Sequence, residues 1–338
     1  MLVLGPSSLS RLSQLVMEAL QAIDIRSSVG EDNLDPFFLR ISAPFIVEHI
    51  ASIFNASILS GFVPSVWKSA QVVPLHKGGD SSDPNNYRPI SKLPCLSKIL
   101  ESLVNNQLKS FLTQQSVLSS HQSGFRANHS TTSAVTLVLD HLITAVGKSK
   151  HAAAIFIDLA KTFDTVDHSL LLERLLISGF DEDACSWFRN YLHGRRQCVK
   201  MGDGQSGFLP VKAGVPQGSI LGPVLFTIYI NEIVSSLCDC QIHLYADDTI
   251  LYCTADSATL AIEKLQRSFN TIQHSFNSLK LTLNDKKTKL MIFSNTPNID
   301  LSNLCITTTN GSSIEQVSEY KYLGIWLDDK LNFKHHYR

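Results

Sequence analysis

Two apolar strands joined by a tight turn that carries adjacent acids form the feature that most constrains this chain. The segment IHLYADDTILYC (242–253) places Asp247 and Asp248 at the tip of a predicted hairpin. A single Asp is common in turns. Two neighbouring carboxylates between apolar strands repel each other, and burying them is costly unless a cation lies beside them. The segment therefore predicts antiparallel pairing and a place for a divalent metal ion.

A third acid ends another apolar strand. In AAAIFIDLA (152–160), Asp158 directly follows Ile157. If this strand pairs beside the 242–253 hairpin, three carboxylates converge, and Mg²⁺ favours such oxygen ligands together with water and substrate phosphate. Two ions about 4 Å apart would then serve phosphoryl transfer. The alternative is that all three acids are ordinary turn or cap residues.

Composition restricts the remaining classes of protein. The 338 residues are 44% hydrophobic and 17% charged, which excludes bulk disorder. The net charge is -1, so a nucleic-acid partner must be held by local basic patches or by metal ions. The seven cysteines are odd in number and include no C-x-x-C pair, which favours a reducing intracellular compartment. No signal peptide is expected, and the most apolar run, 220–230, is too short to span a bilayer, so no membrane partner is expected.

Hydrophobic periodicity predicts an irregular alternation of helices and strands. Helices are expected over 7–28, 41–60, 96–111, 130–146, 168–179, 218–234 and 257–280. Strands are expected over 70–76, 152–160 and 289–294, in the 242–253 hairpin, and as a pair within 196–214, while 77–89 is expected to be a loop. Because the hairpins imply antiparallel pairing, the predicted fold class is α+β.

Glycine-rich and basic segments add weaker signals. Gly218 in GVPQGS (214–219) permits close approach of a ligand to the backbone, and Ser219 can cap the following helix; an ordinary strand-to-helix turn is the alternative. Arg88 and Arg126 lie in Gly- or Pro-containing loops that suit phosphate contacts, although solvated or ion-paired side chains are the alternative. Asp167, or else Ser169, is expected to cap the 168–179 helix.

Taken in order, seven segments resemble the reverse transcriptases of non-LTR (LINE-type) retrotransposons. The resemblance runs from about Gly30 to Phe333. The segments are GFVPSVWKSAQVVPLHKGGD with NNYRPISKLPCLSKILE, HQSGFRANHSTTSAV, FIDLAKTFDTVDH, GVPQGSILGPVLFTIYINEI, YADDTILY, LTLNDKKTKLMIFS and YKYLGIWLD.

The resemblance implies a right-hand polymerase fold with fingers, an antiparallel palm sheet packed on helices, and a missing or truncated thumb. The expected domains are a helical extension over 1–62, fingers over 63–150, a palm over 151–333 with 177–213 as an insertion, and the start of a thumb over 334–338. No endonuclease segment and no Cys/His knuckle is recognised, so the chain is expected to be a fragment of a longer protein.

The resemblance also implies roles for single residues. The metal-binding and catalytic acids are Asp158, Asp247 and, in a supporting role, Asp248, and Lys287 is the proton donor to pyrophosphate. Phe163 matches a steric gate against the ribose 2′-OH, and Tyr320 to Leu327 match a primer-grip hairpin. The residues expected to contact the nucleotide or template are Gln217, Gly218, Arg88, Lys98 and Arg126. Thr162 stands where the family usually has Ala, which is expected to crowd the nucleotide pocket.

The expected function is therefore RNA-directed DNA polymerisation, in which a primer 3′-OH is extended with dNTPs. The resemblance implies two Mg²⁺ ions, with Mn²⁺ as a substitute, and RNA template, DNA primer or target DNA, and dNTPs as partners; no protein partner is implied. The alternative is a catalytically inactive remnant that binds RNA. How such elements integrate implies a nuclear location, with a cytoplasmic ribonucleoprotein as the alternative, although no basic nuclear-import run is present.

Overall fold

A computed structural model of the chain describes residues 9–27, 29–236, 239–294, 303–333 and 335. Its contacts divide the chain into two compact units, each assembled from two stretches of sequence. Unit 1 comprises Met1–Val117 and Phe163–Ile228, and unit 2 comprises Leu118–Thr162 and Tyr229–Arg338. These cut points differ from the domain boundaries expected from sequence, and the assignment of fingers, palm and thumb stays a prediction.

The described residues of unit 1 up to Leu192 form five α-helices. They are α1 (Leu9–Gln21), α2 (Pro36–Ser60), α3 (Cys95–Gln114), α5 (His168–Ile177) and α6 (Glu182–Leu192). The α2 helix begins at Pro36 rather than near residue 41, because Asp35 accepts the Phe37 N–H as N-cap and Pro36 suits the first turn. It ends, as expected, at the left-handed Gly61.

Buried aromatic side chains join these helices. Trp187 of α6, 1% exposed, donates its indole N–H to Ser57 of α2, and it stacks on Tyr191 with ring centroids 5.5 Å apart. Among the described residues, α2 is the one helix long and apolar enough to cross a membrane by length and composition. One third of its most apolar window is buried in this chain, and a core helix passes the same test, so the helix is weak support for a membrane span.

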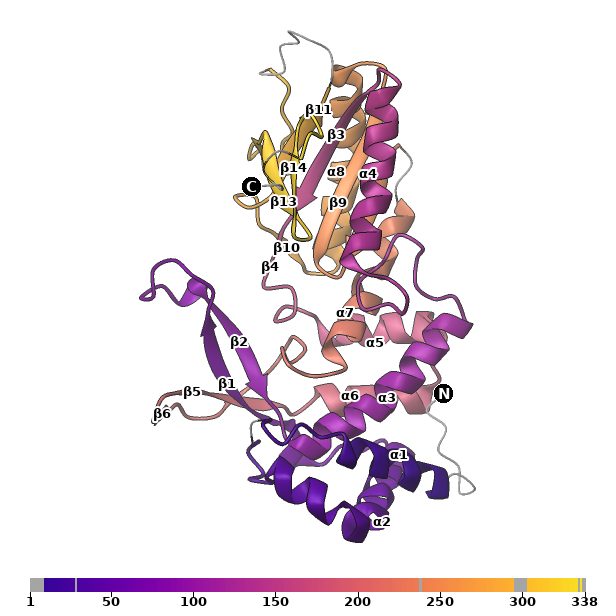
Figure 1. Ribbon diagram of the computed structural model, residues 1–338, viewed down its shortest axis with the longest axis vertical. Helices are drawn as coiled ribbons and strands as arrows, with labels where there is room; N and C mark the ends of the chain where they lie inside the picture. Colours follow the sequence, from indigo (N-terminus) through magenta and orange to yellow (C-terminus); the bar gives the residue numbers. More distant parts are fainter. Residues whose placement is uncertain (1–8, 28, 237–238, 295–302, 334, 336–338) are drawn as a thin grey trace. The chain divides into compact units, whose positions relative to one another are not determined.

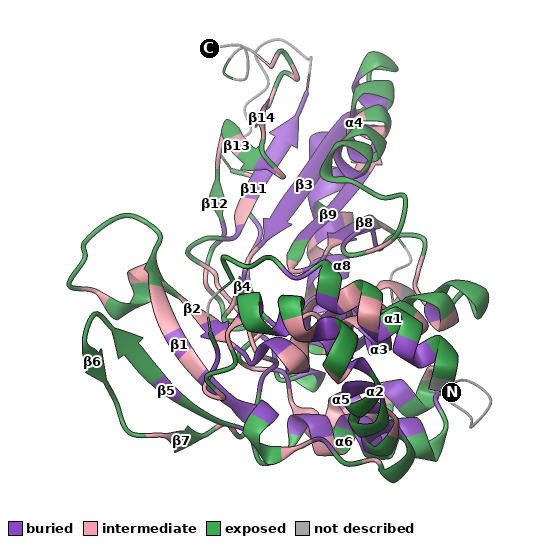
Figure 2. Cartoon of the chain, turned by 60° about the horizontal axis from the view of Figure 1, so that its bottom comes forward, coloured by how far each residue is buried: buried purple, intermediate pink, exposed green. Residues whose placement is uncertain are grey.

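The sheet of unit 1 has the order β2-β1-β5-β6, with β7 also paired to β5. Its strands are β1 (Ser69–His76), β2 (Tyr87–Lys92), β5 (Arg196–Met201), β6 (Gly204–Gln205) and β7 (Leu209–Pro210). The prediction of an irregular loop over 77–89 was wrong at its end, because β2 starts at Tyr87 and pairs antiparallel with β1. Pro89 is tolerated because β2 is an edge strand. Much of this sheet is exposed, in contrast to the sheet of unit 2 (Figure 2).

Unit 2 is built on a five-stranded sheet of order β12-β11-β3-β9-β8 (Figure 1). Its strands are β3 (His151–Ile157), β8 (Gln241–Tyr245), β9 (Asp248–Ala255), β11 (Lys289–Phe293) and β12 (Glu315–Gln316). Every residue of β3 is buried, and both of its neighbours, β9 and β11, run antiparallel to it. The α+β prediction and the predicted 242–253 hairpin are confirmed.

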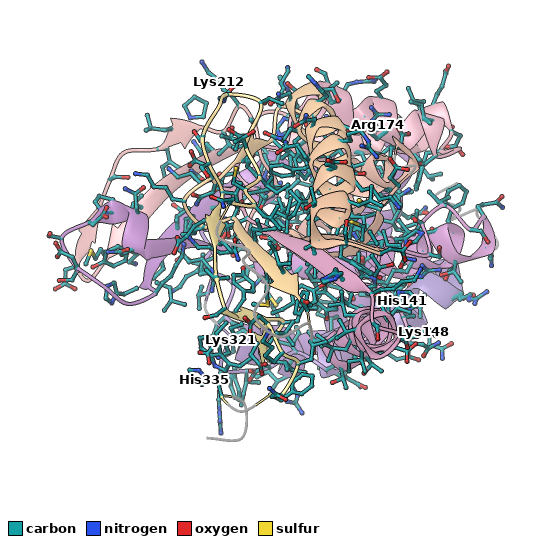
Figure 3. The ribbon with its side chains drawn as sticks, turned by 90° about the horizontal axis from the view of Figure 1, so that it is seen from above. His141, Lys148, Arg174, Lys212, Lys321 and His335 are labelled. Atoms are coloured by element: carbon teal, nitrogen blue, oxygen red, sulfur yellow. The ribbon has the colours of Figure 1, made fainter. Side chains whose placement is uncertain are left out.

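Helices cover the two faces of this central sheet. On one face, α4 (Thr131–Gly147) packs on Ala152, Ala154 and Phe156 in a shared hydrophobic cluster. On the other face, the Cys253 thiol donates to Ala261 of α8 (Ala258–Ser278). The sides alternate because successive strand residues point in opposite directions. His141 of α4 (Figure 3) bonds the Tyr252 hydroxyl at 2.7 Å, which fixes the helix to β9.

Two short pairs of strands complete unit 2. β4 (Leu159–Ala160) pairs with β10 (Thr282–Leu283), and β13 (Glu319–Tyr322) pairs with β14 (Ile325–Asp328). The predicted 320–327 hairpin is therefore confirmed as a structure. At its edge, His335 (Figure 3) stacks on Trp326 with ring centroids 4.3 Å apart.

The apolar helix expected to begin at 218 starts later. α7 (Gly222–Ile230) follows a turn closed by the Ser219 N–H, which donates to the Pro216 carbonyl at 3.1 Å. Ser219 does serve the helix entrance, because its hydroxyl accepts the Gly222 N–H at 2.9 Å. After α7 the chain continues as a 3₁₀ helix, η4 (Asn231–Ser236).

Candidate active site

Three aspartates lie at the same end of the central strands of unit 2. Ile157, the last residue of β3, pairs with Thr249 of β9. The next opposed positions on these two strands are therefore Asp158 and Asp248. Tyr245 of β8 pairs with Asp248, which leaves Ala246 and Asp247 as the two-residue turn. Ala246 takes a positive φ of 59°, the left-handed conformation that such a turn needs. The predicted juxtaposition of the two acidic segments is thus confirmed at the level of strand register.

The acids at this end of the sheet act on one another electrostatically. The pKa of the Asp248 carboxyl is raised to about 6, first by desolvation and then by the charges of Asp247 and Asp158. The same charges act further along the sheet. Burial, followed by the charges of Asp248 and Asp158, raises the pKa of Tyr320 on β13, whose ring stacks on Phe156 at 4.2 Å. Negative charge therefore accumulates in one place, and its like-charge repulsion favours a bound cation.

The donor set suits a divalent metal, but the side chains do not form a preassembled cluster. Within the described ranges, no group of three or more His, Cys, Asp or Glu side chains is arranged so that it could hold a metal ion. Carboxylate oxygens are the ligands that Mg²⁺ prefers, and one or two per ion are sufficient. The residues present therefore fit a divalent cation in kind, while the three-carboxylate convergence stays a prediction.

Asp247 has a hydrogen-bond donor beside it. Thr162, 4% exposed, donates its hydroxyl to Asp247 Oδ2 at 3.2 Å. The expectation that this threonine crowds a nucleotide pocket is not tested, but its hydroxyl contacts a candidate metal ligand. Sequence reasoning had considered Thr162 only as a bulky replacement for Ala.

The loop of the HQSGFR segment supports the Ala246–Asp247 turn. Leu244 N donates to the His121 carbonyl at 2.8 Å, and Ser123 N donates to the Leu244 carbonyl at 2.9 Å. Gln122, fully buried, accepts the Ala246 N–H through its Oε1 at 3.3 Å. A Cβ at Gly124 would lie 2.2 Å from the Ala246 nitrogen, so only glycine allows this approach. Sequence reasoning missed this support, for which the glycine in HQSG was the available signal.

Arg126 belongs to the same loop. Its Nη1 donates to the carbonyl of Ser119 at 2.9 Å and to that of Gln122 at 3.4 Å. In this position it stabilises the loop that supports the aspartate turn. A direct contact of Arg126 with template or triphosphate stays a prediction.

A buried histidine of β8 lies next to this loop. His243 is 1% exposed, and neither of its ring nitrogens has a hydrogen-bond partner. Burial, followed by the nearby His121 and His129, lowers its pKa to about 4, so the ring is neutral at physiological pH.

Lys287 lies in a turn that bonds to the backbone of Asp158. The Asn284 N–H donates to the Asp158 carbonyl at 2.9 Å, and the Lys287 N–H donates to the Asn284 carbonyl at 3.2 Å. The Lys287 side chain is exposed. This places a cationic residue in the turn that bonds to the backbone of Asp158.

The remaining predicted site residues belong to unit 1. Phe163 is half-buried, and its ring stacks on Phe226 of α7 at 5.0 Å. Its carbonyl accepts the Val215 N–H at 2.7 Å, which joins it to the glycine loop. Gln217 donates its side-chain amide to Asp164 at 3.2 Å. Phe163 and Asp164 therefore contact the 214–219 loop, and a nucleotide site formed by them stays a prediction.

Gly218 is explained first by the protein itself. A Cβ at this residue, whose φ is 116°, would lie 2.7 Å from the Ser91 carbonyl of β2. Ser91 N also donates to the Gln217 carbonyl at 2.7 Å. A strand of the same chain thus makes the close approach to the Gly218 backbone, and approach by a ligand stays a prediction.

Two of the predicted site residues in unit 1 are basic, and they differ in exposure. Arg88 is exposed on β2, opposite Leu75, and Lys98 is half-buried in the first turn of α3. Both are compatible with phosphate contacts, and their individual roles stay predictions.

A buried acid of unit 1 was missed by sequence reasoning. Glu101 of α3, 1% exposed, accepts the Ile220 N–H at 2.7 Å and the Tyr191 hydroxyl at 3.1 Å. Desolvation raises the pKa of the Glu101 carboxyl, and the charge of Arg195 opposes this shift. Glu101 thereby attaches the segment after the glycine loop to α3 and α6. A single Glu within an apolar helical pattern was the available signal.

Comparison with known proteins gives a consistent family. Residues 75–327 match the family described as reverse transcriptase (RNA-dependent DNA polymerase). A probable RNA-directed DNA polymerase from transposon BS of Drosophila melanogaster is 31% identical over 336 residues, which cover 95% of this chain and 36% of the relative. The RNA-directed DNA polymerase from mobile element jockey of the same organism is 31% identical, with coverage of 95% and 35%.

A third relative agrees with these two. The probable RNA-directed DNA polymerase from transposon X-element of Drosophila melanogaster is 29% identical over 85% of this chain. The chain spans about a third of the length of these relatives. The resemblance to LINE-type enzymes predicted from the motifs is confirmed, and the chain belongs to the reverse transcriptase (RNA-dependent DNA polymerase) family.

Proposed function

We propose that this chain is the RNA-directed DNA polymerase domain of a non-LTR retrotransposon and that it extends a DNA primer on an RNA template. The observation that carries the proposal is the register of unit 2, which sets Asp158 beside Asp248 at the end of adjacent strands, with Asp247 in the turn between β8 and β9. The raised pKa of Asp248 supports it, because the acids are close enough to repel. Unit 2 then contains the palm, and the β1–β2 hairpin contributes to the fingers.

In the proposed reaction, the primer 3′-oxygen forms a bond to the α-phosphorus of a dNTP, and the bond to pyrophosphate breaks. Asp158 and Asp247 would hold two Mg²⁺ ions, or Mn²⁺ in their place, with Asp248 supporting them. Bound cations would neutralise the charge that develops on the phosphoryl oxygens. Lys287, exposed in the turn that touches Asp158, is the proposed proton donor to the leaving pyrophosphate.

Further predicted residues would select and orient the nucleotide. Phe163 is the proposed steric gate against a ribose 2′-OH, since its stacking on Phe226 holds the ring in place. Gln217 and Gly218 would pack against the incoming nucleotide. The proposed phosphate and template contacts come from basic side chains: Arg88, Lys98 and Arg126.

The proposal is tested by primer extension with the purified chain, poly(rA)/oligo(dT), dTTP, and Mg²⁺ or Mn²⁺. We expect elongation by the wild type. Asp247→Asn and Asp158→Ala should each lower the rate by at least about a thousandfold, because cation stabilisation of the transition state is worth several kcal/mol. Asp203→Asn, which changes an exposed acid between β5 and β6, is the matched control and should retain full activity.

A catalytically inactive remnant that binds RNA is the competing reading. Retention of RNA on a filter without elongation in either metal would support it and overturn our proposal. Undiminished extension by Asp247→Asn or Asp158→Ala would instead remove the metal-ligand assignment. RNA affinity should fall steeply with salt in both readings, because phosphate contacts release counterions. We also propose that the chain acts in the nucleus, where target DNA lies, with a cytoplasmic ribonucleoprotein as the alternative location.

A further inference from the structure

The backbone of Asp158 lies in a gap between two strands. β3 ends at Ile157 and β4 begins at Leu159, so the regular ladder of the central sheet does not include Asp158. Its polar backbone groups bond instead to the turn that follows β10. The carbonyl accepts the Asn284 N–H at 2.9 Å, and the N–H donates to Thr288 Oγ1 at 3.2 Å.

Thr288 closes these contacts into a ring. Its hydroxyl donates to the Asn284 carbonyl at 2.8 Å while it accepts the Asp158 N–H, so both hydrogen-bonding functions of the oxygen are used. The Thr288 N–H also donates to the Asn284 carbonyl, at 2.9 Å. The side chain is fully buried, which shields the ring from water. A hydroxyl in this place therefore fixes the position of the Asp158 backbone through a turn 130 residues away along the chain.

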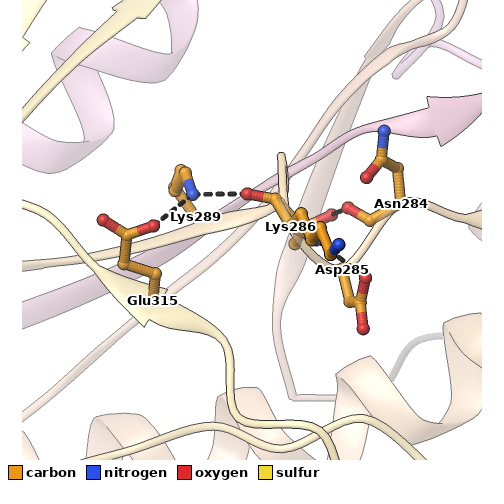
Figure 4. Close-up of polar contacts among 6 residues, drawn as sticks. Asn284, Asp285, Lys286, Lys289 and Glu315 are labelled. Atoms are coloured by element: carbon orange, nitrogen blue, oxygen red, sulfur yellow. Dashed lines mark hydrogen bonds and ion pairs between the residues drawn. The ribbon is translucent and has the colours of Figure 1, made fainter.

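The same turn carries Lys287 and is held at its far end. Lys287 lies between Asn284 and Thr288, and its N–H donates to the Asn284 carbonyl that the Thr288 hydroxyl also uses. Next along the chain, Lys289 donates to the Lys286 carbonyl and forms an ion pair with Glu315 of β12 (Figure 4). A displacement of Asp158 would thus displace the Lys287 turn as well.

We propose that Thr288 is a positioning residue, which sets the place of the Asp158 carboxylate and couples it to the turn that presents Lys287. The inference rests on the proposed function, in which Asp158 binds a cation. Groups that orient a metal ligand contribute 10- to 100-fold, by order of magnitude, to metal affinity or activity. A shift of about 1 Å in a catalytic group can have a similar effect on rate.

Two substitutions separate the hydroxyl from the shape of the side chain. Thr288→Val keeps the β-branched volume and removes the hydroxyl, and Thr288→Ser keeps the hydroxyl. We expect Thr288→Val to lower kcat by about 10- to 100-fold and to raise the Mg²⁺ concentration for half-maximal rate, with a smaller change in KM for dTTP. Thr288→Ser should recover most of the activity. Thr282→Val, at an exposed threonine of β10, is the control that should behave as wild type.

Two further measurements do not depend on turnover. Amide hydrogen exchange at Asp158 should be slow in the wild type and in Thr288→Ser, and faster in Thr288→Val. Binding of Mn²⁺ to the chain, measured by calorimetry, should weaken by about the same factor as the shift in metal dependence. A wild type that binds Mn²⁺ but extends no primer would defeat the proposed function, while the exchange and binding results would still decide the role of Thr288.

Several outcomes would overturn the inference. One is a Thr288→Val variant with wild-type kcat, Mg²⁺ dependence and Asp158 exchange. Another is fast exchange at Asp158 in the wild type itself, which needs no variant at all. If Thr288→Val does not fold, Thr288→Ala should show the same loss without a branched methyl group in place of the hydroxyl. An equal loss in Thr288→Ser would show that packing, and not the hydroxyl, is what matters.

Discussion

Glu101 of unit 1 and Asp248 of unit 2 are both acids whose pKa is raised, and desolvation is the first cause for each. The charges that surround the two acids differ in sign. Glu101 receives hydrogen bonds from two backbone N–H groups, the Tyr191 hydroxyl and Ser97, and it lies in the field of Arg195. Asp248 lies in the field of Asp247 and Asp158.

The difference distinguishes an acid that stabilises a fold from one suited to bind a cation. Around Glu101, hydrogen-bond donors and the charge of Arg195 oppose the desolvation that raises its pKa, and the same hydrogen bonds hold the segment that begins with Ile220 and leads into α7. At Asp248 the neighbouring charges add to the unfavourable desolvation, and a divalent cation would reverse their effect. Glu101 therefore strengthens unit 1, whereas Asp248 weakens unit 2 when no cation is bound.

The largest expected effect tests the stabilising side of this comparison. Glu101→Ala removes the acceptor of the Ile220 N–H. It also removes the carboxylate that interacts electrostatically with the buried Arg195. Loss of one member of a buried charged network typically costs about 3–5 kcal/mol, and we expect a loss of unfolding free energy in that range. Urea unfolding followed by fluorescence of the buried Trp187 measures it.

Two variants serve as controls for this loss. Glu101→Gln keeps an acceptor oxygen and should lose less stability than Glu101→Ala. Glu263→Ala, at an exposed position of α8, should change stability by less than about 0.5 kcal/mol. If Glu101→Ala were as mild as Glu263→Ala, the network would have no structural role and the comparison would fail.

The second prediction concerns Asp248, the acid that is expected to weaken its unit. Asp248 has a folded-state pKa of about 6, above its ordinary value of 3.8, so its ionised form destabilises the fold. The penalty is present above pH 6 and is relieved as pH falls from 6 toward 3.8, because the folded state then binds more protons than the unfolded state. Asp248→Asn should therefore raise the unfolding free energy at pH 7.5 by roughly 1 kcal/mol. This figure is reduced for solvent screening because the residue as a whole is exposed, although its carboxyl is partly desolvated.

Denaturation at pH 7.5 and at pH 4.5, without divalent cations, measures this difference. The advantage of Asp248→Asn should shrink at the lower pH. His243 acts in the opposite direction, because its pKa of about 4 lies below the ordinary 6.5 and stability is lost as pH falls between these values. The variant should therefore lose stability more steeply on acidification than the wild type. A variant less stable than wild type at both pH values would show that Asp248 is held by favourable contacts, like Glu101.

The local sequence predicted most elements of unit 2 because their signals are local. The apolar strands on either side of Asp247 and Asp248, and the strand that ends at Asp158, needed only composition and a turn. The cap of α5 also followed from spacing, and Asp167 accepts the N–H groups of Ser169 and Leu170. The elements of unit 1 were predicted less completely. α6 was not predicted, because the eleven residues EDACSWFRNYL give too short an amphipathic pattern to stand out.

The candidate site also has a part that the sequence predicted and a part that it did not. That acids at two strand ends would lie together followed from the predicted pairing, which register confirms. The contacts that hold them did not follow. The bond from Asp158 to Thr288 spans 130 residues, and that from Ala246 to Gln122 spans 124. Ser, Thr and Gln side chains occur throughout any chain, so nothing in the local pattern marks the few whose oxygens accept a backbone N–H from a distant strand.

The smallest expected effect separates the acids within unit 2. Thr162 donates a hydrogen bond to Asp247, a small version of the compensation seen at Glu101. A hydrogen bond of this kind contributes about 0.5–1.5 kcal/mol, and it occupies an oxygen that a cation could use. Thr162→Ala, which restores the residue usual in the family, should lower the Mg²⁺ concentration for half-maximal primer extension by about two- to threefold and leave kcat within about twofold. Thr254→Ala, in β9 of the same sheet, is the control. A loss of kcat above about tenfold would mean that the Thr162 hydroxyl positions Asp247, and Asp247 would then resemble Glu101 more than it resembles Asp248.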